Sequence, residues 1–324
     1  MQSVAYYVNE FNTYLEKHNK SKSPQQLYDP ITYILGLGGK RLRPALVLMS
    51  TALFGKDHRE ALNAAMAIEV FHNFSLVHDD IMDEAPLRRG EETVHKKWDI
   101  NTGILSGDAM LISAYQYLEN YDDTTFKSIT QLFSKTALEV CEGQQYDMDF
   151  ESREDVTIQE YVKMIEFKTA VLLGAAMKMG AIIAGASSRD QDLLYDFGKH
   201  LGIAFQIQDD YLDAFGNPDT FGKQNGGDII ENKKTFLYLK TKELCSSDEL
   251  KELEHLFSIK PTDPSAKIRI VKGLFEESGA AELSKKEIES YTQSAFKNLD
   301  EAEALNERKA VLRRFGEELI HRES

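Results

Sequence analysis

"HDDIMDE" at residues 78–84 and "IQDDYLD" at residues 207–213 are two copies of one acidic pattern, and each ends an apolar stretch with helical spacing. Aspartates four positions apart fall on one face of a helix, so each copy predicts a helix that presents a cluster of carboxylates. Clustered negative charges repel one another unless a cation compensates them, and oxygen ligands favour Mg²⁺ or Mn²⁺ over zinc. The sequence therefore predicts bound metal at Asp79, Asp80, Asp83, Asp209, Asp210 and Asp213.

The rest of the chain indicates an all-α fold. Long segments are rich in Ala, Leu, Glu and Lys, which favour helices, while glycine and proline gather in short segments between them. No segment alternates as a strand does, and no boundary divides the chain, so we predict one helical domain over residues 1–324. The expected helices span roughly 1–20, 24–35, 41–54, 60–83, 104–120, 125–146, 157–185, 189–215, 233–245, 247–257, 264–278 and 283–317. Two long polar loops are expected over 84–103 and 215–232, each directly after an aspartate cluster.

Composition excludes several classes of protein. A net charge of −15 and a pI near 5.1 disfavour nucleic acid as a partner. The longest apolar stretches, such as "MGAIIAGA" at 179–186, are too short to span a bilayer, and the N-terminus has no signal-peptide pattern. Cys141 and Cys245 form no metal-ligand spacing or disulfide framework, which fits a reducing compartment. We therefore expect a cytoplasmic protein without stable membrane insertion.

Basic residues accompany the first aspartate cluster. "PLRRG" follows it and contains Arg88 and Arg89, whose planar guanidinium groups suit phosphate oxygens. "GGKRLRP" places Lys40 and Arg43 after two glycines at the start of a helix, which is a favourable anion site. Taken one by one, such side chains are usually solvated. Together with metal-binding carboxylates they predict a diphosphate site.

Polar residues near the second cluster extend this pattern. The loop "GKQNGGDIIENKKT" contains Lys223 and Lys233, which we predict to bind substrate; the alternative is a polar loop whose surface ion pairs contribute little. Lys168 lies in the apolar stretch "EFKTA", where burial of a lysine is costly unless it meets an anion or extends to the surface. Gln144 in "GQQYD" and Gln206 in "FQIQDD" lie three residues before an aspartate, where an amide could orient a phosphate or a metal ligand.

These motifs, in this order, resemble those of the trans-isoprenyl diphosphate synthases, the polyprenyl synthase family, in its short-chain type. The resemblance covers nearly the whole chain. It implies a helical bundle, usually a homodimer, in which the two aspartate helices face each other across a central cavity. It also implies three Mg²⁺ ions, with Mn²⁺ as a possible substitute, and two substrates, an allylic diphosphate and isopentenyl diphosphate. The expected product is geranylgeranyl or farnesyl diphosphate, with release of pyrophosphate.

The resemblance also assigns roles to matching positions. It implies direct metal ligation by Asp79, Asp83 and Asp209, and ligation through water by Asp80, Asp210 and Asp213. It implies contacts to the allylic diphosphate from Arg88, Lys168 and Lys233. It implies contacts to the second diphosphate from Lys40, Arg43, His72 and Arg89. The residues expected to face the carbocation are Thr169 and Gln206, with Gln144 and Asp147 lining the same cavity; His78 is expected to orient the first cluster.

Product length depends on the helix before the first cluster, which should form one wall of a slot for the growing tail. With a rise of about 1.5 Å per residue, Ser75 and Phe74 lie roughly 6–8 Å below Asp79, and Phe71 lies about 12 Å below it. In the resembled family, an aromatic residue five positions before the first aspartate is associated with short products. Here that residue is Phe74, and the two-residue insertion of many bacterial farnesyl synthases is absent. We therefore expect the twenty-carbon product, geranylgeranyl diphosphate, ahead of farnesyl diphosphate. The alternative is that Phe71, Phe74 and Ser75 are simply core residues.

Three alternatives remain. A longer-chain polyprenyl diphosphate synthase would share every motif. A terpene cyclase shares the fold but carries an Asn/Ser/Glu-type second motif and needs no second diphosphate site. A regulatory subunit without turnover would be expected to have lost part of an aspartate motif or its basic partners, and this chain has lost none.

Overall fold

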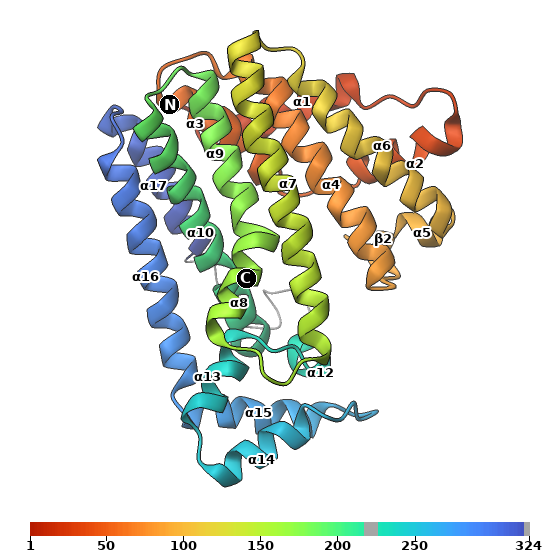
Figure 1. Cartoon of the computed structure of the whole chain (residues 1–324), viewed down its shortest axis with the longest axis vertical. Helices are drawn as coiled ribbons and strands as arrows, with labels where there is room; N and C mark the ends of the chain where they lie inside the picture. Colours follow the sequence, from red (N-terminus) through yellow and green to blue (C-terminus); the bar gives the residue numbers. More distant parts are fainter. Residues whose placement is uncertain (217–225, 321–324) are drawn as a thin grey trace. The chain divides into compact units, whose positions relative to one another are not determined.

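The computed structural model describes residues 1–216 and 226–320, and these are almost entirely helical (Figure 1). The all-α prediction is confirmed, since helices make up 78% of the structure. The first half of the chain forms α1 (Val4–His18), α2 (Gln25–Gly36), α3 (Leu42–Leu53), the 3₁₀ helix η1 (His58–Ala61), α4 (Leu62–Met82), α5 (Val94–Lys97), α6 (Ile100–Leu118) and α7 (Asp123–Ser152). The second half forms α8 (Ile158–Ile165), the π-helix η2 (Glu166–Ala170), α9 (Val171–Ile183), α10 (Ser188–Phe215), α12 (Gly227–Ile230), α13 (Phe236–Leu244), α14 (Ser247–Leu256), α15 (Ser265–Glu277), α16 (Ala280–Glu301) and α17 (Asn306–Ile320).

The chain forms two compact units, which are described separately below. Unit 1 comprises Met1–Ala137, Ala175–Tyr195 and Ala302–Leu312. Unit 2 comprises Leu138–Gly174, Asp196–Glu301 and Arg313–Ser324. The prediction of a single domain stays a prediction. Within the part of the chain that the structure describes, no helix combines the length and the apolarity needed to cross a membrane.

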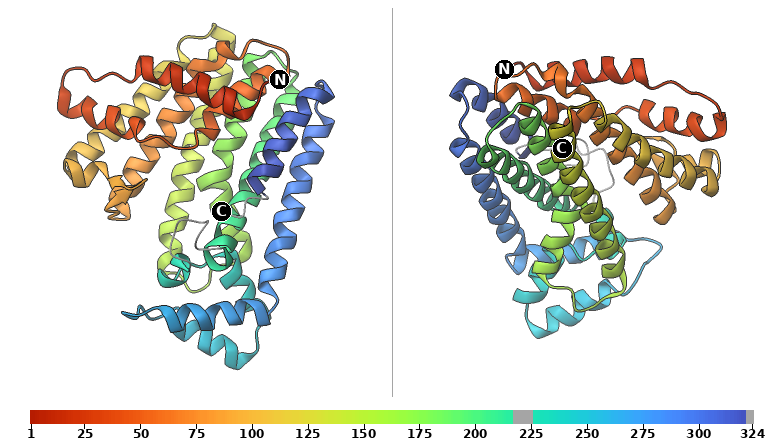
Figure 2. Two further views of the ribbon diagram at one scale, coloured as in Figure 1. Left: turned by 180° about the vertical axis from the view of Figure 1, so that it is seen from behind. Right: turned by 45° about the horizontal axis from the view of Figure 1, so that its top comes forward.

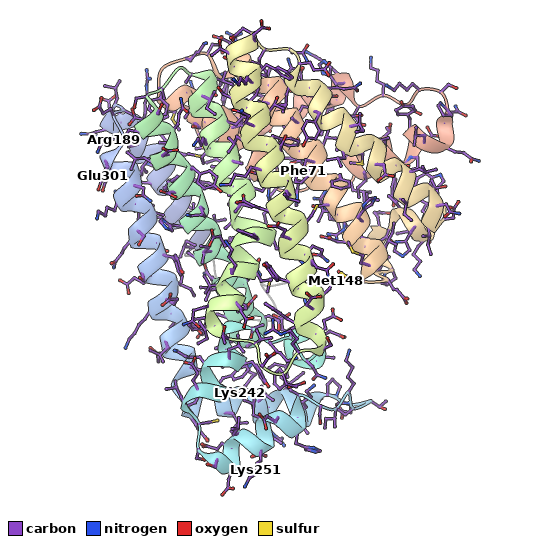
Figure 3. All side chains as sticks on the ribbon, viewed as in Figure 1. Phe71, Met148, Arg189, Lys242, Lys251 and Glu301 are labelled. Atoms are coloured by element: carbon purple, nitrogen blue, oxygen red, sulfur yellow. The ribbon has the colours of Figure 1, made fainter. Side chains whose placement is uncertain are left out.

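Unit 1 is built around α4, which packs against α3 and α6 (Figure 2). Most of α4 is buried, and Phe71, labelled in Figure 3, packs its ring edge-on against Phe133 of α7 with 5.2 Å between ring centroids. Close approach of α3 and α9 requires a residue without a side chain. A Cβ at Gly180 would lie 2.3 Å from the carbonyl oxygen of Val47. The apolar packing of α4 fixes the helix end that carries the first aspartate cluster.

Unit 2 holds the second aspartate cluster near the end of α10. The π-helix η2 lies between α8 and α9, and two glycines allow neighbouring helices to approach it. A Cβ at Gly143 of α7 would lie 2.2 Å from the backbone nitrogen of Lys168, and a Cβ at Gly202 of α10 would lie 2.7 Å from the Cα of Ala170. π-Helical turns are frequent at functional sites, and this one carries Lys168 and Thr169.

Several predicted boundaries are wrong. The predicted helix over 283–317 is two helices, because α16 ends at Glu301 and α17 begins at Asn306. Between them, the backbone N–H of Glu303 donates to Oδ1 of Asp190 at 2.8 Å instead of continuing the helix. The predicted helix over 125–146 is longer and ends at Ser152. Its last carbonyls accept from Lys234 Nζ, a favourable arrangement at a helix C-terminus.

The predicted loop over 84–103 is partly structured. It contains the antiparallel pair β1 (Leu87–Arg88) and β2 (Glu91–Glu92), the short helix α5 and the first turn of α6. Arg89 and Gly90 both have positive φ angles, 55° and 83°, as a tight two-residue hairpin turn requires. The side chain of Asp99 caps α6 by accepting from the backbone N–H of Thr102 at 2.9 Å. The predicted loop over 215–232 includes α12, and residues 217–225 lie outside the described residues.

Candidate active site

The first aspartate cluster lies at the C-terminal end of α4 in unit 1. Asp80 is buried, with a side-chain exposure of 1%, and Arg88 of β1 holds it through a two-pronged ion pair. Arg88 Nε lies 2.7 Å from Oδ2, and Nη2 lies 2.7 Å from Oδ1. Asp83 caps the helix by donating its backbone N–H to the Asp79 carbonyl, and its side chain is exposed. The hairpin therefore delivers a guanidinium group to the second aspartate of the motif.

Arg43, His72 and Arg89, here called the basic group, lie in the same unit. Arg43 Nη1 lies 3.3 Å from His72 Nε2, and Arg89 Nη1 donates to the carbonyl oxygen of Gly38. Gly39 makes room for Arg89, because a Cβ there would lie 2.8 Å from Arg89 Cζ. Among the described residues, none of Lys40, Arg43 and Arg89 forms an ion pair with a carboxylate, and Arg43 Nε has no hydrogen-bond partner. Such a group of uncompensated donors suits an anion.

The positive charge of this group changes the properties of His72. Burial lowers its pKa well below the ordinary value, and the nearby charge of Arg43 lowers it further, followed by those of Arg89, Arg88 and Arg41. His72 is therefore neutral near pH 7, and its ring can donate one hydrogen bond to an anion without adding charge.

The second aspartate cluster lies in unit 2 and has a different environment. Asp210 is buried and accepts from the hydroxyl of Tyr161 at 2.5 Å and from Gln206 Nε2 at 3.1 Å. Thr169 Oγ1 in turn lies 3.4 Å from Gln206 Oε1. Burial raises the pKa of Asp210 well above its ordinary value, and the negative charge of Asp228 raises it further. The two neutral partners oppose this rise but do not supply a positive charge.

The segment after the second cluster is tied to the third aspartate of the motif. The backbone N–H of Asp228 donates to Oδ2 of Asp213 at 2.9 Å. Lys233 Nζ lies 3.6 Å from Asp228 Oδ1 and is largely exposed. Lys223, which the sequence predicts to bind substrate, lies outside the described residues.

Lys168 lies in an apolar helix, where a lysine needs an anionic partner, and the structure provides a carboxylate. Its Nζ lies 2.5 Å from Oδ2 of Asp147, and both side chains are about one-third exposed, at 29% and 32%. Gln144 lies one turn earlier on α7 and is buried, with its Oε1 unpaired. The structure thus brings Asp147 and Lys168 together.

The residues predicted to limit the tail slot form an aromatic stack in unit 1. The ring centroids of Phe71 and Phe74 lie 5.6 Å apart, and Phe74 also packs against His78 at 4.8 Å. Phe133 of α7 extends the stack beyond Phe71. Ser75 donates its hydroxyl to the backbone carbonyl of His72 at 2.9 Å. His78 Nε2 lies 3.2 Å from the carbonyl oxygen of Ile104 on α6.

Sequence reasoning missed several residues around the site. Tyr161 is one of them, because nothing local in the sequence indicates that its hydroxyl meets Asp210. Arg41 and Glu69 form a buried ion pair, with both side chains 3% exposed. The signal for this pair was present, since Glu69 is a charged residue within the apolar stretch that leads to the first cluster. Phe133 could have been found from the helical spacing of apolar residues in α7.

Hard divalent cations fit the donors at both clusters. Over residues 1–216 and 226–320, no three His, Cys, Asp or Glu side chains already converge on one metal position. The donors are carboxylates, however, and the pKa of Asp210 is raised first by burial and then further by repulsion from Asp228 and Asp209. A bound cation would remove this repulsion, and oxygen donors favour Mg²⁺, Mn²⁺ or Ca²⁺.

Comparisons with known proteins define the class first. A solved geranylgeranyl pyrophosphate synthase superposes with a TM-score of 0.96, at 53% identity over 100% of both chains. The geranylgeranyl pyrophosphate synthase of Geoglobus acetivorans is 39% identical over 89% of both chains. The geranylfarnesyl diphosphate synthase of Natronomonas pharaonis is 37% identical over 86% of this chain and 85% of its own. The fold is therefore the helical fold of the isoprenyl diphosphate synthases.

The model of the polyprenyl synthetase family matches residues 24–274, and the chain belongs to this family. It is a trans-prenyltransferase, and the prediction of a short-chain enzyme of this kind is confirmed. Enzymes of the family join an allylic diphosphate to isopentenyl diphosphate and need a divalent metal.

Proposed function

We propose that this prenyltransferase makes geranylgeranyl diphosphate from isopentenyl diphosphate and an allylic primer, with farnesyl diphosphate as the alternative product. The group of cations around His72 carries the proposal, because Arg43 and Arg89 have no carboxylate partner among the described residues. A second anionic substrate satisfies these donors. A cyclase, which acts on one allylic diphosphate, would have no use for them.

The metal in this proposal is Mg²⁺, as three ions, with Mn²⁺ as a substitute. When bound, it neutralises the negative charge that develops on the departing diphosphate. Asp79, Asp83 and Asp209 would supply direct ligands. Ligation through water would come from Asp80, Asp210 and Asp213.

The protein's own residues would hold the allylic diphosphate and protect the cation. Arg88, Lys168 and Lys233 would contact the diphosphate as the carbon–oxygen bond breaks and the electron pair leaves with the diphosphate oxygen. The side-chain oxygens of Thr169 and Gln206 would stabilise the allylic cation, near Gln144 and Asp147. Lys223 would join the substrate contacts.

The second substrate would be held through its diphosphate by Lys40, Arg43, His72 and Arg89. Its terminal double bond attacks the allylic cation and forms the new carbon–carbon bond. One proton then leaves the adjacent carbon for the departing diphosphate, which balances the reaction and regenerates a double bond. Water must be excluded while the cation exists, because water would convert it to an alcohol.

The aromatic stack supports a short product. Phe74 and Phe71 lie on the helix that leads to Asp79, and their rings are in contact with each other. We propose that they form the floor of the tail slot. Replacing Phe74 with alanine should lengthen the product by one or more five-carbon units, as measured by mass spectrometry of the extracted products. An unchanged product distribution would remove Phe74 as the floor.

One assay tests the function as a whole. The purified protein is incubated with Mg²⁺, isopentenyl diphosphate and each allylic primer in turn, and the molecular masses of the products are measured by mass spectrometry. We expect a twenty-carbon product and no turnover when isopentenyl diphosphate is omitted or EDTA is added. Turnover without isopentenyl diphosphate would favour a cyclase, products longer than twenty-five carbons would favour a long-chain synthase, and no pyrophosphate release at all would favour a regulatory subunit.

We also propose that the enzyme is a cytoplasmic homodimer. One face of α6 supports association, because Leu105 and Ile112 are each 60% exposed and lie seven residues apart, on the same side of the helix as Ile104. Among the described residues, Cys141 and Cys245 form no disulfide bond, which suits a reducing compartment. Sedimentation velocity should give twice the mass of the chain, and a monomer at micromolar concentration would refute the dimer.

A further inference from the structure

Arg41 and Glu69 form an ion pair that is almost completely excluded from water. Arg41 Nη1 donates to Glu69 Oε1, and Arg41 Nη2 donates to the carbonyl oxygen of Leu35 at 2.5 Å. Asn73 joins the pair from the next turn of α4, since its Nδ2 lies 3.0 Å from Glu69 Oε1 and 2.8 Å from the Glu69 carbonyl. The carboxylate therefore accepts from two side chains in the interior of unit 1.

This arrangement is costly, so a stability argument alone does not explain it. A buried ion pair is often no more stabilising than well-packed apolar residues of the same size, because both charges lose their hydration. Arg41 also has a φ angle of 49°, in the left-handed region that side chains disfavour. Arg41 is the N-cap residue of α3, so the pair holds the backbone in this conformation at the point where the helix begins.

The position of the pair relative to the basic group suggests what it does. Glu69 and His72 lie three residues apart on α4, one helical turn, while Arg41 and Arg43 lie two residues apart at the start of α3. Two contacts therefore join the start of α3 to α4: Arg41 with Glu69 and, one turn further along α4, Arg43 with His72. A change in the first contact would shift the second.

The arginines near Glu69 differ in whether they pair with a carboxylate. Glu69 accepts directly from Arg41, whereas Arg43 and Arg89 form no ion pair with a described carboxylate. Arg43 still feels Glu69 at longer range, because that negative charge opposes the lowering of its pKa by burial. Of the two arginines in "KRLR", Arg41 therefore pairs with a carboxylate in the interior, and Arg43 remains available for an anion.

We propose that Arg41 and Glu69 are positioning residues for the second diphosphate, which they never touch. They fix the start of α3 so that Arg43 and His72 stand together, and Asn73 holds the Glu69 carboxylate in place. This inference rests on the proposed function, because it assigns the diphosphate of isopentenyl diphosphate to the basic group.

Glu69→Gln tests the proposal, since it keeps the size of the side chain and removes its charge. The KM for isopentenyl diphosphate should rise about tenfold, the scale expected when a charged hydrogen bond that orders a site is lost. The KM for the allylic primer and kcat should change less than about twofold. Titration calorimetry with isopentenyl diphosphate in EDTA should show the same loss of affinity without metal and without turnover.

Arg41→Lys is the second variant, in case Glu69→Gln does not fold. It keeps the positive charge but loses the fork that reaches both Glu69 and Leu35, and it should show the same selective loss. Asp190→Asn is the matched control: Asp190 is a buried carboxylate of unit 1 that binds Ser187 and Glu303. This control should lower the melting temperature and leave the ratio of the two KM values unchanged.

The outcomes separate the two hypotheses. Unchanged affinity for isopentenyl diphosphate in a folded Glu69→Gln or Arg41→Lys variant overturns the positioning role. Equal losses for both substrates, as in a generally destabilised protein, overturn it as well. A wild-type protein that binds no isopentenyl diphosphate overturns the proposed function and this inference together.

Discussion

The two aspartate motifs share a sequence pattern but have opposite electrostatic environments. In the first motif, the buried carboxylate of Asp80 is paired with the guanidinium group of Arg88. In the second, the equivalent carboxylate of Asp210 is held by the neutral side chains of Tyr161 and Gln206, and the charge of Asp228 raises its pKa further after burial. The first cluster is therefore partly neutralised by the protein itself. At the second cluster, the hydrogen bonds that Asp210 accepts from Tyr161 and Gln206 come from neutral side chains.

This difference shows that a sequence motif fixes which carboxylates are present but not the charges that surround them. The partner of the second aspartate comes from a hairpin in one case and from α8 and the body of α10 in the other. The following predictions test whether the two environments matter, from the largest expected effect to the smallest.

Arg88→Met should have the largest effect, because it leaves the carboxylate of Asp80 buried without its cation. We expect the free energy of unfolding to fall by about 2 kcal/mol, which is less than for a fully buried pair because the Arg88 side chain is 26% exposed. The value of kcat/KM should fall by about a hundredfold or more, because Arg88 is also a proposed substrate contact. Urea unfolding and steady-state kinetics measure the two effects.

A matched control for Arg88→Met is Lys251→Met on α14, labelled in Figure 3. Lys251 pairs with Asp248 at 3.0 Å, but the two side chains are 77% and 94% exposed. Removing this ion pair should leave stability and activity unchanged within error. If the two variants lose equal stability, burial of Asp80 is not what makes its partner important.

Tyr161→Phe should have a smaller effect, because it removes a neutral partner and leaves Gln206 in place. We expect a loss of about 1 kcal/mol of unfolding free energy, the usual scale for one hydrogen bond. Activity should fall more at limiting Mg²⁺ than at saturating Mg²⁺, because Asp210 is less well oriented. Tyr238→Phe, at another buried tyrosine of unit 2, provides the control. Equal losses at all Mg²⁺ concentrations would contradict a role in orienting Asp210.

His72→Gln should have the smallest effect on stability, and this effect on the free energy of unfolding appears only at low pH. The unfolded chain takes up a proton near pH 6.5, whereas burial and Arg43 keep native His72 neutral well below that pH. Stability should therefore fall as pH drops below about 6.5, by at most about 1.4 kcal/mol per pH unit from this residue. Urea unfolding from pH 7.5 to 5 should show a shallower fall in the variant. Parallel curves for the two proteins would contradict the lowered pKa of native His72.

Local features of the fold were predictable from the sequence. Apolar periodicity places α4 and α10 correctly, and the order of motifs indicates the family. The break after Glu301 was not predictable, because it depends on Asp190, a residue more than a hundred positions earlier. The π-helix at Glu166–Ala170 was also missed, because a one-residue shift of hydrogen bonds leaves the pattern of apolar residues nearly unchanged.

The charged residues of the candidate site could be predicted from the sequence, but the side chains that hold them in place could not. Repetition of the acidic pattern indicates carboxylates, and the basic motifs indicate anion binding. The partners Tyr161 and Glu69 were missed, because each reaches its aspartate or arginine across a distance in sequence that no local pattern records. The contact of Lys168 with Asp147 was easier, because an amphipathic cation in an apolar helix raises the question of its anion.

The tight hairpin at Arg88–Glu91 has a consequence for the two proposed diphosphate sites. Two consecutive residues reach different partners from it, one the carboxylate of Asp80 and the other the carbonyl of Gly38. Under the proposed function, Arg88 contacts the allylic diphosphate and Arg89 contacts the second diphosphate. Because the two arginines are adjacent in one short hairpin, binding at one would alter affinity at the other, and this coupling would be equal in both directions.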